Sequence, residues 1–575
     1  MNKRLVLALI LLAVLATPAS LLKAASQSPG PILGKLAIVV VIDGADYRVL
    51  DEANLTYLPY LASVGSYTLE AHTVLPSMTT VAHASLACGA YPSVTNVAAT
   101  SALNATAYRE EGLEDKFRYY ETINATSIVE VALKEGVKVA AIVGKSKCRV
   151  MLGKSGVADV IKVLEEDPYG ATITGPDVYK KTFPMTNRYK QDEWIANETI
   201  KVIEQFYDSL VKGERLLILV NMPALDWCGH AFGRDSSEYL AVLKNADKQV
   251  GRIIEKVEEL GLWRNTLLVV LPDHGMENVD PSHRISSDGT SLYLPRIEHV
   301  ALDAGGKAAY VYLKNLDDMQ SAVQYLWDYC QASGVWTRIP VDGANGTLDD
   351  IGLNTVFAGD IFVEFKGDWQ FYYENEGAHG GVSTQRIFVY FAGWTVKEGY
   401  EIESDVSIVD VAPTVSAFLG IPAPPESQGK VLNEIFESPF GSVGLSVEPT
   451  IANVGDELVV GVNYTLSEPT QAQLSIMLLD ENYAVLDTKN YTISNTSGTF
   501  VEKWTMDAEG TVYVYALLLG PQDVVIASAR EKALVVRAIE VELPWPQIIA
   551  MGVLTVVLGV LLIAGTFKLR RRELQ

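Results

Sequence analysis

The chain has 575 residues, of which 49% are hydrophobic and 20% are charged, and its formal net charge is −24. A chain of this length contains more than one ordinary domain, and its acidic balance excludes nucleic-acid binding, which needs clustered Lys and Arg. Its 4 cysteines are too few for a disulfide framework, so stability must come from packed cores.

Residues 1–25 have the pattern of a secretory signal peptide. Lys3 and Arg4 precede an apolar run over 5–16, and small residues follow up to Ala25. We expect export and cleavage, with an uncleaved membrane anchor as the alternative. Glycosylation sequons fit an exported glycoprotein. They lie at Asn54, Asn104, Asn124, Asn197, Asn345, Asn463, Asn490 and Asn495.

Strand and helix signals alternate from about residue 35 to residue 440. Short apolar runs are typical of buried strands, and the long amphipathic pattern over 236–260 is typical of a helix that packs on a sheet. The expected strands are 37–42, 137–143, 216–220, 267–271 and 387–391. This alternation predicts an α/β domain over 35–440, with a largely parallel sheet covered by helices on both faces.

The regular alternation of strand and helix signals is interrupted between residues 283 and 376. A strand is expected at 308–313, a helix at 318–330 and another strand at 360–365. We interpret this segment as an α+β cap that is inserted into the α/β domain.

The helix signals stop after the proline-rich step at 421–425. Short runs of strand-forming residues, separated by turn residues, follow it. The expected strands are 457–466, 471–479, 498–506, 511–519 and 523–529. The pattern predicts an antiparallel, immunoglobulin-like β-sandwich over 441–541. No catalytic residue is visible there, so we interpret the sandwich as a stalk, with a carbohydrate- or partner-binding role as the alternative.

The segment 547–567 carries no charged residue and is long enough to cross a hydrocarbon core of roughly 30 Å. Trp545 stands at its outer edge and a basic cluster at 568–572 follows, which places the tail 568–575 in the cytoplasm by the positive-inside rule. We therefore expect a single-pass transmembrane helix in the cell membrane, with the other domains outside the cytoplasm.

Carboxylate and imidazole side chains follow the expected strands. They are Asp43, Asp226, His230, Asp273, His274 and His379. Because α/β sheets gather ligands at the carboxyl ends of their strands, we expect these residues to converge. Such a mixed ligand set suits zinc or another first-row divalent metal better than calcium or magnesium. Each residue alone could be a turn residue, a helix cap or a satisfied histidine, but together they indicate a metal-dependent hydrolase.

A hydroxyl-rich turn supplies the candidate nucleophile. It contains Ser77, Thr79 and Thr80 and precedes a helix that begins near Val81. A hydroxyl is a weak nucleophile at neutral pH, but coordination to a dication lowers its pKa, so Thr79 beside metal ions would be activated. The alternative is that these hydroxyls only cap the helix.

Taken together and in order, these motifs resemble the alkaline phosphatase superfamily. The resemblance runs from about Leu36 to Leu432, and its closest branch is the type I phosphodiesterase and nucleotide pyrophosphatase group. The motifs are Asp43-Gly44, Pro76 to Thr79, His83 to Ser85, Gly89 to Pro92, Asp226 with His230, Asp273 to Met276, His379-Gly380, Asp410 to Thr414 and Leu419 to Pro422.

The resemblance implies two divalent metal ions, usually zinc. It assigns one ion to Asp226, His230 and His379, and the other to Asp43, Asp273, His274 and the hydroxyl of Thr79. In this family the hydroxyl attacks phosphorus to form a phosphothreonine intermediate, which water then hydrolyses from the opposite side.

Two features bear on the substrate. The pyrophosphatase branch has an asparagine that donates to a phosphate oxygen where this chain has Thr100, so either Thr100 or Asn96 would supply that donor. Lys145 and Lys147 resemble a lysine pair of phosphonoacetate hydrolases that holds anionic groups of the substrate, and a solvated loop is the alternative. If both lysines bind, the substrate has a second negative group besides its phosphorus centre.

We therefore expect a phosphodiesterase or nucleotide-pyrophosphatase-like hydrolase that acts on a small phosphorylated or phosphonate substrate. A phosphonoacetate hydrolase-like enzyme and a lipid- or glycan-headgroup phosphotransferase are alternatives that use the same metals. An inactive surface binding module is the alternative without activity. A sulfatase is a poor fit, because no Cys-x-Pro-x-Arg stretch lies near Thr79.

Overall fold

The computed structural model describes residues 34–537, apart from short gaps at 169, 175–176, 394, 438–440, 467–468, 482–483 and 521–524. The predicted signal peptide 1–25, transmembrane helix 547–567 and tail 568–575 lie outside the described residues. Among the residues that are described, no helix combines the length and apolar character needed to cross a membrane.

An eight-stranded sheet forms the centre of the catalytic domain, with the strand order β17-β2-β16-β8-β1-β7-β5-β6. β1 (Leu36–Ile42) lies between β7 (Leu216–Met222) and β8 (Thr266–Leu271) and is parallel to both. β16 (Arg386–Ala392) pairs with β8 in the antiparallel direction, so the sheet is mixed. The remaining strands are β2 (Gly65–His72), β5 (Lys138–Val143), β6 (Val160–Val163) and β17 (Tyr400–Glu401).

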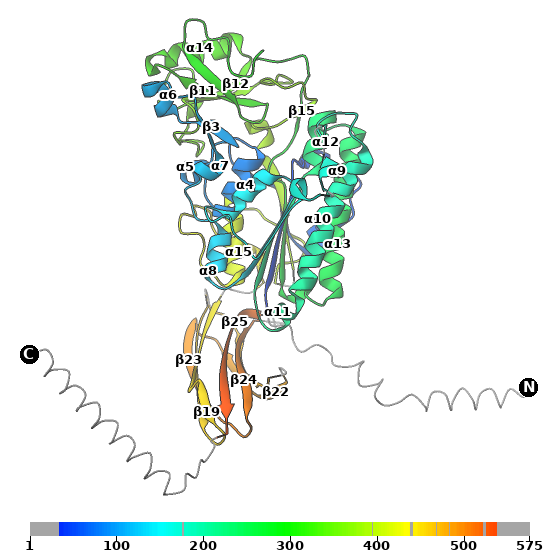
Figure 1. Ribbon diagram of the computed structural model, residues 1–575, viewed down its shortest axis with the longest axis vertical. Helices are drawn as coiled ribbons and strands as arrows, with labels where there is room; N and C mark the ends of the chain where they lie inside the picture. The colour runs from blue at the N-terminus through cyan, green and yellow to red at the C-terminus, as the bar shows by residue number, and fades with distance from the viewer. Residues whose placement is uncertain are drawn as a thin grey trace, which may run out of the picture.

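Helices cover both faces of this sheet, as the sequence predicts (Figure 1). Alternate residues of β1 enter different cores: Val39 and Val41 pack on one face, and Ile38 and Val40 pack on the other. The first face carries α4 (Thr79–Cys88), α8 (Ile128–Lys134) and α15 (Val411–Leu419). The second face carries α3 (Tyr57–Val64), α10 (Met185–Gln205), α12 (Ala224–Phe232) and α13 (Ser237–Glu259).

Short elements complete the catalytic domain. They are α5 (Pro92–Thr95), α6 (Ala105–Glu111), α7 (Tyr119–Thr122), α9 (Gly170–Thr174), α11 (Tyr207–Val211), β3 (Ser101–Leu103), β4 (Lys116–Arg118), β9 (Glu277–Asn278) and β15 (Gly377–Ala378). β3 pairs with β4 and β9 pairs with β15, so both ribbons lie outside the main sheet.

A separate α+β unit lies at one end of the catalytic domain (Figure 1). It is a five-stranded sheet in the order β10-β11-β14-β12-β13, and α14 (Met319–Tyr329) shares its apolar core. The strands are β10 (His299–Asp303), β11 (Ala308–Leu313), β12 (Ala332–Thr337), β13 (Gly346–Thr347) and β14 (Ile361–Phe365). The sequence predicts β11, α14 and β14, whereas β10, β12 and β13 were not expected.

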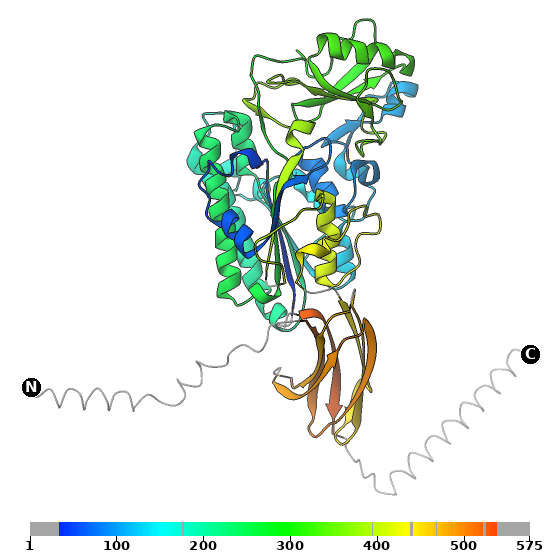
Figure 2. The same cartoon turned by 180° about the vertical axis from the view of Figure 1, so that it is seen from behind.

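A β-sandwich follows at the opposite end of the molecule (Figure 2). One sheet has the order β18-β20-β23 and the other has the order β19-β25-β24-β21-β22, around a shared apolar core. The strands are β18 (Gly441–Glu448), β19 (Ile451–Asn453), β20 (Glu457–Leu466), β21 (Ala472–Leu479), β22 (Val485–Ile493), β23 (Ser497–Thr505), β24 (Gly510–Leu519) and β25 (Val525–Val536). The sandwich is not wholly antiparallel, because β19 runs parallel to β25.

A buried lysine joins the sandwich to the catalytic domain. Lys35 Nζ donates to the carbonyl of Phe418 at 2.8 Å and to that of Ile526, in β25, at 2.5 Å. Burial and the nearby Arg215 lower the pKa of Lys35 to about 7. One side chain therefore ties the two domains together through their backbones.

Candidate active site

The first group of candidate ligands lies beyond β7. Asp226 and His230 are one turn apart on α12, and His379 stands in the loop before β16. Asp226 Oδ1 lies 3.3 Å from His230 Nε2 and 3.6 Å from His379 Nε2. The ligand atoms of all three lie within 4.8 Å of one another, so they could hold one metal ion.

The second group forms at the carboxyl ends of β1 and β8. Asp43 follows β1, and Asp273 and His274 follow β8. Their ligand atoms also lie within 4.8 Å of one another. The rings of His274 and His379 stack with their centroids 3.7 Å apart, so the two groups are direct neighbours. The structure thus brings together all six predicted carboxylate and imidazole residues.

Backbone carbonyls fix the three imidazoles. The Nδ1 atoms of His230, His379 and His274 lie 2.8, 2.9 and 2.9 Å from the carbonyl oxygens of Gly377, Ser77 and Gly275. A carbonyl oxygen only accepts, so each Nδ1 carries the hydrogen and each Nε2 keeps its lone pair. Metal-binding histidines are commonly oriented in this way.

The donor set fits divalent metal ions. Asp226 Oδ1 and Asp273 Oδ2 are buried and accept no hydrogen bond, and one of them belongs to each group. Burial, followed by the charge of Asp43, raises the pKa of Asp273 to about 7. Unpartnered buried carboxylate oxygens are costly, and a cation placed beside them would remove that cost. Carboxylate oxygens together with imidazole nitrogens suit zinc-like dications.

Thr79 is the first residue of α4 and lies beside the second group. Its Oγ1 is 3.5 Å from Asp43 Oδ1 and 3.4 Å from His274 Nε2. No side chain caps the start of α4, and Ser77 Oγ donates to the carbonyl of Gly381. The alternative that these hydroxyls only cap the helix is therefore not supported. The positive end of this helix favours negative charge near the hydroxyl.

Lys145 lies below the site and does not form the predicted clamp with Lys147. It is 2% exposed, and its Nζ is 2.6 Å from Asp226 Oδ2 and 2.9 Å from Asp43 Oδ2. Burial alone would lower the pKa of Lys145, but Asp226 and Asp43 raise it well above its ordinary value. Its ammonium is held by two carboxylates, and Lys145 does not line the cavity, whereas Lys147 does.

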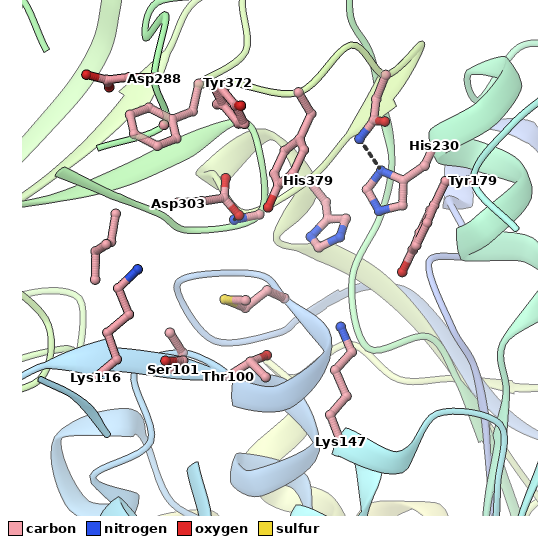
Figure 3. A pocket seen from close by; sticks show the side chains of 18 residues that line it. Thr100, Ser101, Lys116, Lys147, Tyr179, His230, Asp288, Asp303, Tyr372 and His379 are labelled. Atoms are coloured by element: carbon pink, nitrogen blue, oxygen red, sulfur yellow. Dashed lines mark hydrogen bonds between the residues drawn. The ribbon is translucent and has the colours of Figure 1, made fainter. Parts of the chain in front are cut away.

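A cavity of about 590 Å³ opens between the catalytic domain and the cap. Figure 3 shows His230 and His379 beside it, with Lys147 and Thr100 on the side of the catalytic domain. Cap residues form another part of the wall. They include Asp288, Asp303, Tyr372 and Tyr373. Its volume is in the range of small-ligand sites.

The two candidates for the phosphate donor are placed differently. Thr100 lines the cavity, and its Oγ1 lies 2.6 Å from that of Thr80. Asn96 does not line it, because its amide donates to the carbonyl of Thr122 and accepts from the hydroxyl of Thr355. Of the two predicted donors, Thr100 therefore lies at the cavity, and Asn96 is engaged by Thr122 and Thr355.

Sequence reasoning gave no role to two buried polar residues under the site, Asn221 and His83, although His83 stands in one of the motifs that carry the resemblance. Asn221 Nδ2 donates to Asp43 Oδ2 at 2.9 Å and also contacts His83 Nε2 at 3.2 Å. His83 Nδ1 lies 2.8 Å from the carbonyl of Thr79. They connect the start of α4 with the ligand Asp43. The available signal was an asparagine inside the otherwise apolar run of β7.

The fold is similar to those of solved phosphoesterase structures. Human ectonucleotide pyrophosphatase/phosphodiesterase 5 aligns with a TM-score of 0.52 at 15% identity, covering 70% of this chain and 100% of that one. The alkaline phosphatase PafA aligns with a TM-score of 0.54 at 15% identity, covering 70% of this chain and 99% of that one. These likenesses confirm the predicted alkaline-phosphatase-like fold.

Sequence comparison points to the same family. The alkaline phosphatase PhoV of Synechococcus elongatus is 25% identical over 322 residues, a match that spans 47% of this chain and 56% of PhoV. The sequence model of the type I phosphodiesterase / nucleotide pyrophosphatase family matches residues 37–389, which include every candidate ligand and Thr79. The chain therefore belongs to the type I phosphodiesterase / nucleotide pyrophosphatase family.

Proposed function

We propose that the protein is a two-metal phosphodiesterase that acts through a phosphothreonine intermediate at Thr79. The observation that carries this proposal is the contact between the two ligand groups, in which the His274 and His379 rings lie 3.7 Å apart, with Thr79 Oγ1 3.4 Å from His274 Nε2. Such an arrangement places a hydroxyl beside two sites for cations.

Zinc is the proposed metal. Asp226, His230 and His379 would hold one ion, and Asp43, Asp273, His274 and the Thr79 hydroxyl would hold the other. When bound, the ions would supply positive charge that lowers the pKa of a hydroxyl and neutralises phosphate oxygens. The lone pairs on the three Nε2 atoms and the two unpartnered carboxylate oxygens support this assignment.

The residues of the chain supply position and charge. Thr79 Oγ1 would attack phosphorus, the P–O bond to the leaving group would break, and water would later hydrolyse the phosphothreonine. The first turn of α4 would favour the negative charge that collects on the phosphate oxygens. Lys147, which reaches into the cavity, would bind one of these oxygens (Figure 3).

A diester is the proposed substrate in preference to a phosphonate or another compact dianion. The predicted two-lysine clamp would bind a second negative group, but of these two lysines Lys147 lines the cavity, while Lys145 is paired with Asp226 and Asp43. Lys116 is a second ammonium in the cavity wall, so the preference for a diester rests on the match to the type I phosphodiesterase family.

We further propose that the enzyme works outside the cytoplasm and is attached to the cell membrane. The signal-peptide pattern of 1–25 and the charge-free segment 547–567 with its basic tail support this location. The β-sandwich would act as the stalk between the membrane and the catalytic domain.

A substrate panel with zinc present tests the reaction. It compares bis-p-nitrophenyl phosphate, p-nitrophenyl phosphate, a nucleoside triphosphate and phosphonoacetate, and the diester should have a higher kcat/KM than the monoester and the phosphonate. Thr79→Ala should remove each activity that belongs to the protein. Release of phosphate and acetate from phosphonoacetate, with no diesterase activity, would contradict the proposal.

A further inference from the structure

A third group of metal-ligand side chains lies where the cap joins the catalytic domain. It consists of Asp280, His283 and Asp368, whose ligand atoms lie within 4.8 Å of one another. This group is separate from the two groups of the candidate active site, and none of its members is among the residues that line the cavity. The side chains of His283 and Asp368 are 40% and 53% exposed, so an ion could reach them from solvent.

The two chain segments that connect the cap meet at this group. β9 pairs with β15 just before the chain enters the cap and just after it leaves. Asp280 donates its amide to the carbonyl of Asp368 at 2.9 Å, and Gln370 donates its amide to the carbonyl of His283 at 3.0 Å. Two of the three ligands therefore belong to the entering segment and one to the leaving segment, so a shared ion would link the segments.

Other contacts hold the leaving segment in place. The ring of Trp369 stacks on that of His283, with the centroids 4.7 Å apart and the planes 12° from parallel. The ammonium of Lys307 binds three backbone carbonyls on both sides of Asp368. They belong to Phe365, Gly367 and Trp369, at 2.6, 2.7 and 3.0 Å. The imidazole and the carboxylate are thus positioned before any ion binds.

His283 offers a nitrogen without a hydrogen-bond partner. Its Nδ1 is buried and makes no hydrogen bond with any described residue. Asp368 Oδ1 lies 3.1 Å from it, yet the two atoms do not meet in hydrogen-bond geometry. Two ligand atoms that each lie about 2.1 Å from one ion, at a right or tetrahedral angle, are about 3.0–3.4 Å apart. The separation of these two atoms therefore fits a shared ion.

Asp280 completes the donor set with a carboxylate that stays charged. Its Oδ1 accepts hydrogen bonds from the hydroxyl and the amide of Ser282, at 2.6 and 2.8 Å, and these bonds hold the pKa of Asp280 below its ordinary value. One imidazole with two carboxylates suits zinc or another first-row dication, whereas calcium prefers a shell of oxygens alone.

We propose that Asp280, His283 and Asp368 bind a zinc-like divalent ion that links the two connecting segments of the cap. This ion takes no part in the reaction, so the inference does not rest on the proposed function. Tyr372 and Tyr373, which line the cavity, follow Asp368 closely along the chain. The ion would therefore help to hold the cap side of the cavity wall.

The first test is the zinc content of the full chain after dialysis against a zinc buffer. The wild type should hold one equivalent more than His283→Ala and Asp368→Asn, whatever number the candidate active site holds. His72→Ala is the matched control and should keep the wild-type content. His72 is also exposed and lies 3.4 Å from a carboxylate oxygen, that of Asp405, but belongs to no group of three ligands among the described residues.

Two results of this measurement would overturn the inference. Equal zinc content in the wild type and both variants would leave His283 and Asp368 as an ordinary ion pair. Loss of one equivalent from His72→Ala as well would show that zinc binds unspecifically to exposed pairs of histidine and aspartate.

Hydrogen exchange then locates the ion. Relative to the metal-free protein, excess zinc should slow amide exchange in residues 279–286 and 366–371 by at least about tenfold, because an ion that binds only the folded arrangement opposes local opening. His283→Ala and Asp368→Asn should lose this protection, and His72→Ala should keep it. Protection that survives in both variants would contradict the site, and equal protection by calcium would contradict its donor chemistry.

Discussion

Lys145 Nζ lies 2.6 Å from Asp226 Oδ2, and the same ammonium lies 2.9 Å from Asp43 Oδ2. Asp226 and Asp43 belong to different ligand groups, so one buried cation connects both. In the protein without metal, this ammonium is the main charge that compensates the two carboxylates.

Lys145→Met should therefore destabilise the metal-free protein. Removing one partner from a buried ion pair costs roughly 3–5 kcal/mol, because charges are left buried without compensation. Zinc should restore much of this stability, since the ions would take over the charge compensation. Thermal unfolding with and without zinc measures the effect, with Lys147→Met as the control for a cavity-lining lysine. An equal loss in both conditions would contradict this role.

Removal of metal should abolish turnover, and zinc should restore it. His230→Ala should also lower the zinc content, because its Nε2 belongs to the first ligand group. His72→Ala is the matched control, since His72 is exposed and belongs to none of the possible metal-ligand groups of the described residues. Activity and metal content should be measured on the same samples. Full activity of a protein shown to be free of metal would refute metal dependence.

Substitutions at Thr79 and Thr80 should separate the nucleophile from its neighbour. Thr79→Ala should lower kcat by several orders of magnitude, because no positioned hydroxyl remains, and Thr79→Ser should keep part of the activity. Thr80→Ala should have a mild effect, since Thr80 Oγ1 bonds to Thr100 and not to the ligand groups. Trapping of labelled phosphate on the protein measures the intermediate. The opposite ranking of the two alanine variants would move the nucleophile to Thr80.

The buried Asp192 should make stability depend on pH. Burial raises the pKa of Asp192 to about 8, so the folded state holds its proton more tightly than the unfolded state does. Stability from this group is complete at low pH and is lost as the pH rises from about 4 towards 8. Asp192→Asn should therefore gain stability relative to the wild type by up to about 1.4 kcal/mol per pH unit in this window.

The measurement is the urea midpoint of the zinc-loaded protein at pH 5 and pH 8. Glu193→Gln is the control, because Glu193 is the exposed neighbour of Asp192 on α10. A stability difference between Asp192→Asn and the wild type that is the same at both pH values would contradict the assigned shift.

Topology can be tested on intact cells. If the signal is cleaved and 547–567 spans the membrane, added protease should remove the catalytic domain and leave a tag after Gln575 protected. Truncation before Pro544 should give a soluble and active enzyme, since no candidate catalytic residue lies beyond His379. A tag that is digested from outside would reverse the orientation.

The sequence predicted the strands that carry the site because these strands are buried on both faces. β1, β7 and β8 each contain a run of at least five apolar residues, and each ends at the same edge of the sheet. Because these three strands are parallel, Asp43, Asp226 and Asp273, which follow them, lie close together. The missed strand β22 is mostly exposed or half-buried, and its sequence has no apolar run.

The partners of the Lys145 and Asn96 side chains could not be predicted from local sequence. Lys145 is buried because α12 places Asp226 above it, and this contact joins residues 81 positions apart. Asn96 is held by Thr355 of the cap, 259 positions away. Both side chains carry the chemistry of a substrate ligand, and only their long-range partners decide how that chemistry is used.

The course of β25 has a consequence for how this enzyme would meet its substrate. The strand starts near the catalytic domain, where Ile526 meets Lys35, and ends at the far tip of the sandwich, where Val536 pairs with Asn453 (Figure 1). The cap and the cavity lie at the other extreme of the molecule. If the chain is attached to a membrane beyond β25, the opening of the cavity faces away from that membrane. The enzyme would then act on esters dissolved in the surrounding fluid and not on lipids of the membrane that holds it.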